Sequence, residues 1–400
     1  MIKYQILNRF KNVNYFYLKK ILINEFMNVF KKIILFIKNL FSHKSTNNQD
    51  LLGFNSYLLN TSRIYNCTNE ISQSILWRAN SDLNKPLLDI TDKPSKFVED
   101  THHYVSLATY YWPNPDTQDG MPYIVKDGYI NPEVKEYDLY KIQELSYRLR
   151  HYMMAYILTK NDQYYQIFLN QIVRWFIDKN TYMYPKFEYC QIGPGTNNNK
   201  GINTFESYFL INILEYITIM NSITPFDPEL VNNLKIWIKD LVKYIETSKP
   251  GQFENNMRNN HSIMYDVGLI YFKILSTGKL DTNIVNRFYK RITKQILEDG
   301  SQPEELKRNQ GFKYSVYNLE HIIDGIKIIQ NTQNTIPENI LNLVNKAFVF
   351  LKQFNSQEEF NSKYQEIGNW NQCYDYYLQQ AARLNIEKYD FNINKDFLTF

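Results

Sequence analysis

Residues 230–245 read LVNNLKIWIKDLVKYI, and their pattern decides the fold class. Apolar side chains recur here after three or four residues, which places them along one face of a helix. The apolar positions are Leu230, Val231, Leu234, Trp237, Ile238, Leu241, Val242 and Ile245. Residues 263–275 repeat this template with Ile263, Met264, Val267, Ile270, Tyr271, Ile274 and Leu275. Both stretches therefore predict amphipathic helices that each bury one face.

The helical pattern extends outward from these two stretches and begins at about residue 136. Further helices are predicted over residues 137–159, 162–178, 203–220, 284–297, 316–331, 336–354 and 371–384. The connections are short, which favours antiparallel helix pairs arranged as a solenoid or as a closed α/α ring. Because no repeat of fixed length is visible, the solenoid is less favoured. The sequence thus predicts an all-α fold of antiparallel helix pairs.

Two long stretches interrupt the helices. Residues 101–135 carry four prolines, two Asp-Gly pairs and many aromatic side chains, and residues 184–203 also read as a loop. Loops of this length in a compact domain are usually functional or disordered. The apolar and aromatic content of residues 101–135 is too high for disorder. We therefore predict an ordered loop that covers another part of the protein.

The composition bounds the class of protein. With 400 residues, 44% of them hydrophobic, the chain is long enough for one large domain or two ordinary ones. Glycine and proline number only 13 each, which disfavours an all-β protein. The net charge of +4 is compatible with an anionic partner and too small to indicate nucleic acid. Cys67, Cys190 and Cys373 lack metal-ligand spacing and are expected to be free or buried thiols.

The N-terminal 50 residues differ in character from the rest. Residues 26–41 mix an apolar run with three lysines, and the run is too interrupted for a spanning helix of ~20 residues. It fits a signal peptide, a basic amphipathic helix on a membrane surface, or an extra helix packed on the domain. Residues 43–50 read as a linker. We predict a separate segment over residues 1–50 and one domain over residues 51–400.

Residues 255–266, NNMRNNHSIMYD, place polar side chains at the start of a helix. Asn260 lies two turns before Val267 and therefore shares its inward face. Asn260 and His261 would lie at the helix N-terminus, an end that favours anions. The alternative is purely structural, with Asn259 or Asn260 as the helix cap and His261 as a satisfied, partly buried histidine.

Residues 299–318, DGSQPEELKRNQGFKYSVYN, form a polar, turn-rich stretch between two predicted helices. Arg308 and Tyr314 stand six residues apart in it and combine a fixed cation with a phenol. Read alone, the stretch favours an ordinary loop in which Glu304, Glu305 and Arg308 are solvated or paired.

The chain resembles the alginate lyase domain family in four stretches that follow the family's order. They are HHYVSLATYYWPNP (102–115) with DGMPYIVKDGYINPE (119–133), YIETSKPGQFENNMRNNHSIMYDV (244–267), DGSQPEELKRNQGFKYSVYNL (299–319) and, more weakly, NKAFVFLKQF (345–354). The likeness covers about residues 52–385. The chain departs from the family pattern at His103 and Tyr111. The interval from Arg308 to Tyr314 is one residue shorter than in the best-known bacterial members, so Tyr317 stays open as a second candidate.

The resemblance implies an α/α toroid, or incomplete α/α barrel, with long loops over a cleft. It also implies β-elimination on a polymer of uronic acids, without a metal or a cofactor. Asn260, His261 and Arg308 would neutralise the uronate carboxylate. Tyr314 would act as base and acid, because a nearby Arg308 favours the ionised form of a phenol whose ordinary pKa is about 10. His261 would be the base where the proton lies on the opposite sugar face.

The resemblance also assigns substrate-binding residues. Tyr110, Tyr111 and Trp112 would offer flat surfaces to sugar rings, and Lys126 would offer a cation to a uronate. The alternative is that these loop aromatics only cover one end of the toroid as core. Asn259 and Tyr265, beside the predicted catalytic pair, complete the set of candidate substrate-binding residues.

Two other functions stay open at this point. A glycoside hydrolase on the same toroid needs two carboxylates across the scissile bond, for which Glu206, Asp266, Glu304 and Glu305 are available. A non-catalytic glycan-binding protein would keep the toroid without the chemistry. For the lyase we expect an acidic polysaccharide as partner, no nucleic acid, and a location outside the cell or at a cell or particle surface.

Overall fold

The computed structural model describes residues 58–384 except residues 60, 95 and 197–203. The predictions for residues 1–50, a distinct segment followed by a linker, lie outside the described residues. Within the described part of the chain, no helix is both long and apolar enough to span a bilayer. Cys67, Cys190 and Cys373 are free thiols, as the sequence led us to expect.

The described chain is mostly helical, which confirms the predicted all-α class. The α-helices are α2 (Ser62–Tyr65), α3 (Asn69–Asp82), α4 (Asp138–Thr159), α5 (Asp162–Phe176), α6 (Phe209–Ile223), α7 (Pro228–Thr247), α8 (Lys249–Asn255), α9 (Asn260–Thr277), α10 (Thr282–Gln295), α11 (Pro303–Leu306), α12 (Gly311–Asn331), α13 (Glu338–Lys352), α14 (Gln357–Asn361) and α15 (Trp370–Arg383). Two 3₁₀ helices, η1 (Pro132–Glu136) and η2 (Phe205–Tyr208), precede α4 and α6. Every helix predicted above is present, with ends that differ by a few residues.

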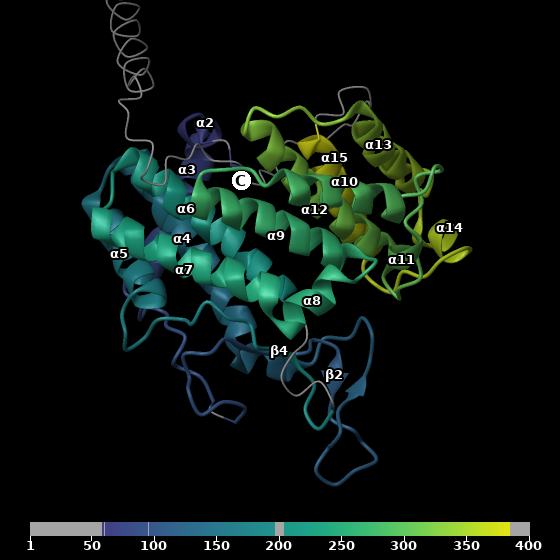
Figure 1. The fold of residues 1–400 in the computed structure, drawn as a ribbon, viewed down its shortest axis with the longest axis horizontal. Helices are drawn as coiled ribbons and strands as arrows, with labels where there is room; N and C mark the ends of the chain where they lie inside the picture. Colours follow the sequence, from purple (N-terminus) through teal and green to yellow (C-terminus); the bar gives the residue numbers. More distant parts are fainter. Residues whose placement is uncertain (1–57, 60, 95, 197–203, 385–400) are drawn as a thin grey trace, which may run out of the picture. The chain divides into compact units, whose positions relative to one another are not determined.

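The helices form two layers that alternate along the chain. α4, α6, α9 and α12 pack against one another in succession as one layer, while α5, α7, α10 and α13 belong to the second (Figure 1). The chain passes from the first layer to the second and back through short connections, such as the turn at Lys160, which has a left-handed backbone. This alternation is the arrangement of an α/α toroid, as predicted.

α9 is the most deeply packed helix of the two layers. It contacts α7, α8, α10 and α12, and Figure 1 draws it across the middle of the fold. α7 buries one face, as predicted, whereas α9 is buried on nearly all sides, so the expectation of one buried face was too narrow there. Gly325 on α12 allows this close packing, because a Cβ there would come within 2.6 Å of the Phe288 ring on α10.

The two predicted loops contain short strands, which the sequence analysis missed. β1 (Val105–Leu107) pairs in parallel with β4 (Tyr189–Ile192), and β2 (Tyr111–Trp112) pairs in antiparallel fashion with β3 (Ile124–Val125). A second small core, formed by Val98, Val105, Leu107, Val134, Tyr137 and Ile192, lies under these strands. The expectation that residues 101–135 are ordered is therefore correct. The strands were missed because two to four residues are too short to show a period.

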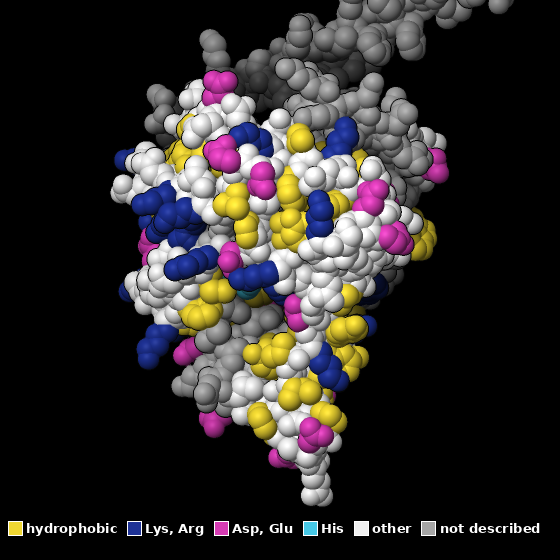
Figure 2. Space-filling model, turned by 90° about the vertical axis from the view of Figure 1, so that its right-hand side faces the viewer, with side chains coloured by type: hydrophobic (Ala, Val, Ile, Leu, Met, Phe, Trp, Pro, Cys, Tyr) yellow, Lys and Arg dark blue, Asp and Glu magenta, His cyan; other side chains and the backbone are white. Residues whose placement is uncertain are grey.

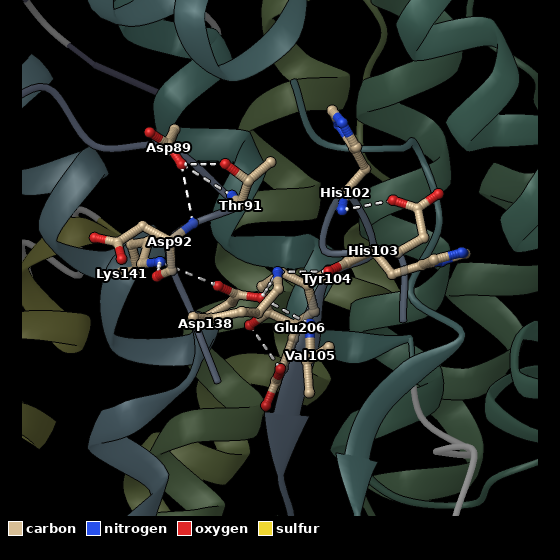
Figure 3. A network of polar contacts seen from close by, with 12 residues as sticks. Asp89, Thr91, Asp92, His102, His103, Tyr104, Val105, Asp138, Lys141 and Glu206 are labelled. Carbon is tan, nitrogen blue, oxygen red and sulfur yellow. Dashed lines mark hydrogen bonds and ion pairs between the residues drawn. The ribbon is translucent and has the colours of Figure 1, made fainter. Parts of the chain in front are cut away.

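A buried polar network fixes the start of this loop to α4. Asp138, the first residue of α4, accepts a hydrogen bond from the backbone N–H of Val105 at 2.9 Å and forms an ion pair with Lys93 (Figure 3). Neither side chain of the pair is exposed to solvent. Asp89 accepts hydrogen bonds from Thr91 and from the backbone of Asp92, which orders the preceding turn. The start of the 101–135 loop is thus held to α4 by a buried ion pair and a hydrogen bond.

Replacing Lys93 with methionine is expected to lower the free energy of unfolding by about 3–5 kcal/mol, because it leaves Asp138 buried without its main cation. Denaturant unfolding followed by circular dichroism measures the change. Lys346→Met is the matched control, since Lys346 pairs with Glu298 at the surface and such a pair contributes about 0–1 kcal/mol. Equal effects of the two substitutions would contradict the assigned role of Lys93.

Candidate functional site

The N-terminus of α9 is closed by a carboxylate from another segment. Glu305 of α11 accepts hydrogen bonds from the backbone N–H of Asn260 at 2.6 Å and from its Nδ2 at 2.7 Å. An anion is favourable at a helix N-terminus because the free N–H groups and the helix dipole point at it. Asn260 is buried on the inward face of α9 together with Val267, as predicted. Of the two caps considered, Asn259 occupies the N-cap position and Asn260 does not, although the Asn259 side chain makes no capping hydrogen bond.

Glu305 also connects α9 with Arg308. The Glu305 carboxyl is almost fully buried, and burial raises its pKa, while Asn260, His261 and Arg308 act in the opposite direction. The backbone N–H of Arg308 donates to the carbonyl of Glu305 at 3.0 Å. Glu305 therefore bonds the amide of Asn260 from the same chain segment that carries Arg308.

His261 is held by a second buried glutamate. Its Nδ1 lies 3.2 and 3.1 Å from the two carboxylate oxygens of Glu254 on α8, and its ring stands edge-on against Phe205. Burial acts to lower the pKa of His261, but the charge and hydrogen bond of Glu254 outweigh it and the net pKa is raised. Because Nδ1 faces Glu254, proton exchange with a ligand would fall to Nε2.

The guanidinium of Arg308 lies over the ring of Tyr314. Its guanidinium carbon is 4.0 Å from the ring centroid, a cation–π contact. Burial raises the pKa of Tyr314 well above its ordinary value and the neighbouring Tyr110 adds to this, while Arg308 acts to lower it. The expected direction of the Arg308 effect is confirmed, but the expectation that the ionised phenol is favoured is wrong for the net pKa.

Tyr110 joins the same group from the 101–135 loop. Its hydroxyl is 2.6 Å from the hydroxyl of Tyr314, although the two residues are far apart in sequence. Tyr317, the second candidate, lies one turn after Tyr314 on α12, with a ring-centroid distance of 6.5 Å between them. Burial raises the pKa of Tyr317, and the charges of Glu320, Glu206, Tyr110 and Glu305 raise it further. The two tyrosines therefore contact each other edge to face on the same side of α12.

The other predicted loop residues lie along the β2–β3 hairpin. The Lys126 ammonium lies 5.0 Å from the centre of the Trp112 ring, and the indole N–H of Trp112 donates to the backbone oxygen of Tyr129 at 2.8 Å. Tyr111 lies against Gly193, where a Cβ would come within 2.7 Å of its ring. Figure 2 shows several Lys and Arg side chains across the middle of this face, above the tapering lower part of the molecule.

The structure does not bring Tyr265 to this group. Its ring packs beside Arg287 and Arg291 of α10, with guanidinium carbons 5.4 and 5.9 Å from the ring centre. Both arginines form ion pairs with Asp266. Five residues after Asn260, the helical rotation turns Tyr265 toward another face of α9. A role of Tyr265 in substrate binding therefore has no support from its position.

Asn259 contributes through its backbone. Its carbonyl oxygen accepts hydrogen bonds from Nε2 of Gln295 at 2.9 Å and from the hydroxyl of Ser262 at 3.1 Å. Its side-chain oxygen is buried and has no hydrogen-bond partner within the part of the chain that the structure describes. Asn259 thus lies next to the group, with a polar atom that nothing described satisfies.

The acidic residues considered for hydrolysis all form hydrogen bonds or ion pairs with other residues of the chain. Glu206 is fully buried and accepts hydrogen bonds from Tyr104 at 2.7 Å and from Gln191 (Figure 3). Asp266 pairs with two arginines, and Glu305 holds Asn260. Glu304 pairs with Lys307 at the surface. A hydrolase needs two carboxylates facing one bond, and these contacts do not provide such a pair.

Three carboxylates that organise the site, those of Glu254, Asp127 and Glu305, were not predicted in these roles from the sequence. Asp127 forms a two-point ion pair with Arg308, with a shortest distance of 2.8 Å. Asp127 belongs to one of the Asp-Gly pairs of the loop, and that turn signal was its only sign. Within residues 58–384, apart from the gaps named above, no cluster of three or more His, Cys, Asp or Glu side chains is placed to hold a metal ion.

The two-layer helical toroid, with its arginine, tyrosine, asparagine and histidine beside a covering loop, is that of a polysaccharide lyase. The sequence profile described as alginate lyase matches residues 89–383. The chain therefore belongs to the alginate lyase family.

Solved structures agree with this assignment. An alginate lyase from Bacteroides ovatus matches with a TM-score of 0.73 and 27% identity, over 79% of this chain and 86% of that one. A variant of alginate lyase A1-III in complex with a tetrasaccharide matches with a TM-score of 0.54 and 14% identity, over 88% of this chain and 94% of that one. At that identity the second match shows the fold alone. A search of curated proteins gave no match.

Proposed function

We propose that this lyase cleaves alginate or a related polymer of uronic acids by β-elimination at the site described above. One observation carries the proposal. The guanidinium of Arg308 lies 4.0 Å over the ring of Tyr314, and Glu305 ties the amide of Asn260 to the same segment. His261 follows Asn260 directly at the start of α9 and is held there by Glu254.

The positively charged residues of the site meet the first requirement of the reaction, which is to neutralise the substrate carboxylate. Removing the proton at C5 of a uronate leaves negative charge that spreads into a carboxylate, so the carboxylate must be neutralised first. Arg308 and protonated His261 supply positive charge, and the remaining amide N–H of Asn260 supplies a hydrogen bond. The raised pKa of His261 supports this role, because it favours the imidazolium form.

Tyr314 is the proposed base and acid. Its phenolic proton first leaves to solvent, and the phenolate then takes the proton from C5. The electrons of the C5–H bond form a C4=C5 double bond while the bond from C4 to the glycosidic oxygen breaks. Tyr314 returns the proton to that oxygen. The products are one chain with an unsaturated end and one with a new reducing end, and no water is consumed.

His261 is the alternative base for substrates whose C5 proton lies on the opposite sugar face. This role requires neutral imidazole, and the raised pKa of His261 disfavours it at acidic pH. The loop residues Tyr110, Tyr111, Trp112 and Lys126 are proposed to contact neighbouring sugars, since a polymer extends beyond the unit that reacts. Because such a polymer does not cross membranes, we also propose that the protein acts outside the cell or at a surface.

A product assay tests the reaction. The purified protein is incubated with a panel of uronate polymers, alginate first, and ultraviolet absorbance of the conjugated double bond is recorded. We expect absorbance to rise on at least one polymer. New reducing ends without absorbance would indicate hydrolysis instead. Tight oligosaccharide binding that survives the loss of both His261 and Tyr314, without any product, would indicate a non-catalytic glycan-binding protein.

Replacing Glu254 with glutamine is expected to shift the alkaline limb of the pH–activity profile to lower pH. Burial lowers the pKa of His261 and Glu254 raises it, so without the charge of Glu254 the pKa falls. If protonated His261 neutralises the substrate, activity is lost as pH rises through that pKa, and the loss then begins earlier. Glu304→Gln, at an exposed carboxyl, is the control and should leave the profile unchanged. A shift of the limb to higher pH would contradict the assignment.

A further inference from the structure

The donor edge of Arg308 is already occupied by a carboxylate of the covering loop. Nη2 of Arg308 lies 2.8 Å from one oxygen of Asp127, and Nε lies 3.3 Å from the other. Both side chains are only partly exposed, at 24% and 28%. Burial acts to raise the pKa of Asp127, but the hydrogen bond and charge of Arg308 outweigh it and the net pKa is lowered. At neutral pH the pair is therefore charged on both sides.

The turn that carries Asp127 is itself fixed to the segment after Arg308. Nδ2 of Asn309 donates to the carbonyl of Asp127 at 3.3 Å, and Nε2 of Gln310 donates to the carbonyl of Gly128 at 3.1 Å. Gly128 has a left-handed backbone with φ of 85°, and a Cβ there would come within 2.7 Å of the Ile367 side chain. Asp127 is thus held at a fixed place beside the guanidinium.

Two fixed contacts then determine where the guanidinium lies. Asp127 binds the edge that carries Nε and Nη2, and the guanidinium carbon lies 4.0 Å from the centre of the Tyr314 ring. A guanidinium has five N–H donors in a planar fork, so the edge that carries Nη1 stays available for a substrate carboxylate. The charge of Asp127 also acts to raise the pKa of Tyr314. Asp127 therefore orients the cation and at the same time offsets part of its charge.

We propose that Asp127 is the positioning residue that sets Arg308 over Tyr314 and directs its free edge toward the substrate carboxylate. This inference rests on the proposed function, in which Arg308 neutralises that carboxylate. Asp127 therefore has two separate effects, one on the attraction of the substrate and one on the geometry of Arg308. Without the Asp127 charge, Arg308 attracts an anionic substrate more strongly, but it is no longer held in the reactive geometry.

The test compares Asp127→Asn with Asp119→Asn in the full chain, using alginate and ultraviolet detection of the product. Asp119 is the matched control, because it is an exposed aspartate of the same loop and is also followed by glycine. For Asp127→Asn we expect kcat to fall by about 10- to 100-fold, as for small misplacements of a catalytic group. KM should fall or stay level, which a general loss of folding would not produce. Asp119→Asn should match the wild type.

A double-mutant cycle with Arg308→Lys makes the test independent of folding effects. If Asp127 acts through Arg308, the Asp127→Asn substitution should change kcat much less in the Arg308→Lys background. An unchanged kcat in an active protein, or full additivity of the two substitutions, would overturn the inference alone. A wild-type protein that releases no unsaturated product from any uronate would overturn the proposed function, and the inference with it.

Discussion

Replacing Tyr314 with phenylalanine is expected to lower kcat by about 10²- to 10⁴-fold, the usual contribution of a general acid–base group. The substitution removes only the hydroxyl and keeps the ring, so the contact with Arg308 at 4.0 Å is retained. Substrate binding depends on the cations and should change little, so KM should stay near the wild-type value. Initial rates of ultraviolet absorbance over a range of alginate concentrations separate the two constants.

Tyr317→Phe is the control that distinguishes the two candidate tyrosines. Tyr317 lies on the same helix one turn further, and its ring packs against His321 with a centroid distance of 4.3 Å. Within the described residues, Tyr314 contacts both the guanidinium of Arg308 and the hydroxyl of Tyr110. In this part of the chain, neither contact is made by Tyr317. Equal losses in the two variants would show that Tyr314 is not the principal base, and a larger loss at Tyr317 would reverse the assignment.

The helices could be predicted from the sequence wherever one face is apolar over three or more turns. α7 fulfils this condition and was predicted almost to its ends. α3 was missed because, of its fourteen residues, only Ile75, Ala79 and Asp82 are buried, which is too sparse to show a period. Its start is set by Thr68, whose side chain accepts from the backbone N–H of Ile71. A cap of this kind is common in an Asn- and Thr-rich chain and identifies a helix only when an apolar stripe follows it.

Only those features of the site that depend on a single helix could be predicted from the sequence. The inward direction of Asn260 follows from helical rotation, and the structure confirms it. The partners that set its chemistry come from other segments. Glu305 is 45 residues from Asn260, and Asp127 is 181 residues from Arg308. These two pairs form only when the segments are brought together by the tertiary fold. The spacing of residues along the sequence does not predict such contacts.

The net pKa of Tyr314 illustrates the same limit in energetic terms. From the sequence, the nearby arginine was the only known influence, and it favours the phenolate. In the structure, burial and the hydroxyl of Tyr110 both favour the neutral phenol, and together they outweigh Arg308. The site therefore rests with a protonated tyrosine. A substrate that separates Tyr110 from Tyr314 would remove one of the influences that oppose ionisation.

Replacing Arg308 with alanine is expected to lower kcat/KM by about 10³-fold or more. Removal of one hydrogen-bond donor that stabilises a developing charge typically lowers kcat by about 10²- to 10³-fold. Arg308 contributes more than one donor, because it provides a full charge, a planar fork and a contact to the Tyr314 ring. We expect KM to rise, because Arg308 binds the carboxylate in the ground state. We expect kcat to fall, because more negative charge has to be stabilised in the transition state.

Arg308→Lys separates charge from geometry. A lysine restores the positive charge but not the planar fork, so it cannot pair with Asp127 at two points as Arg308 does. We expect it to recover part of KM and little of kcat. Lys307→Ala removes the neighbouring surface cation, which pairs with Glu304, and should leave both constants near the wild-type values. If Arg308→Ala keeps kcat/KM within a few-fold of the wild type, the guanidinium does not neutralise the substrate. The reaction would then have to draw its positive charge from His261 alone.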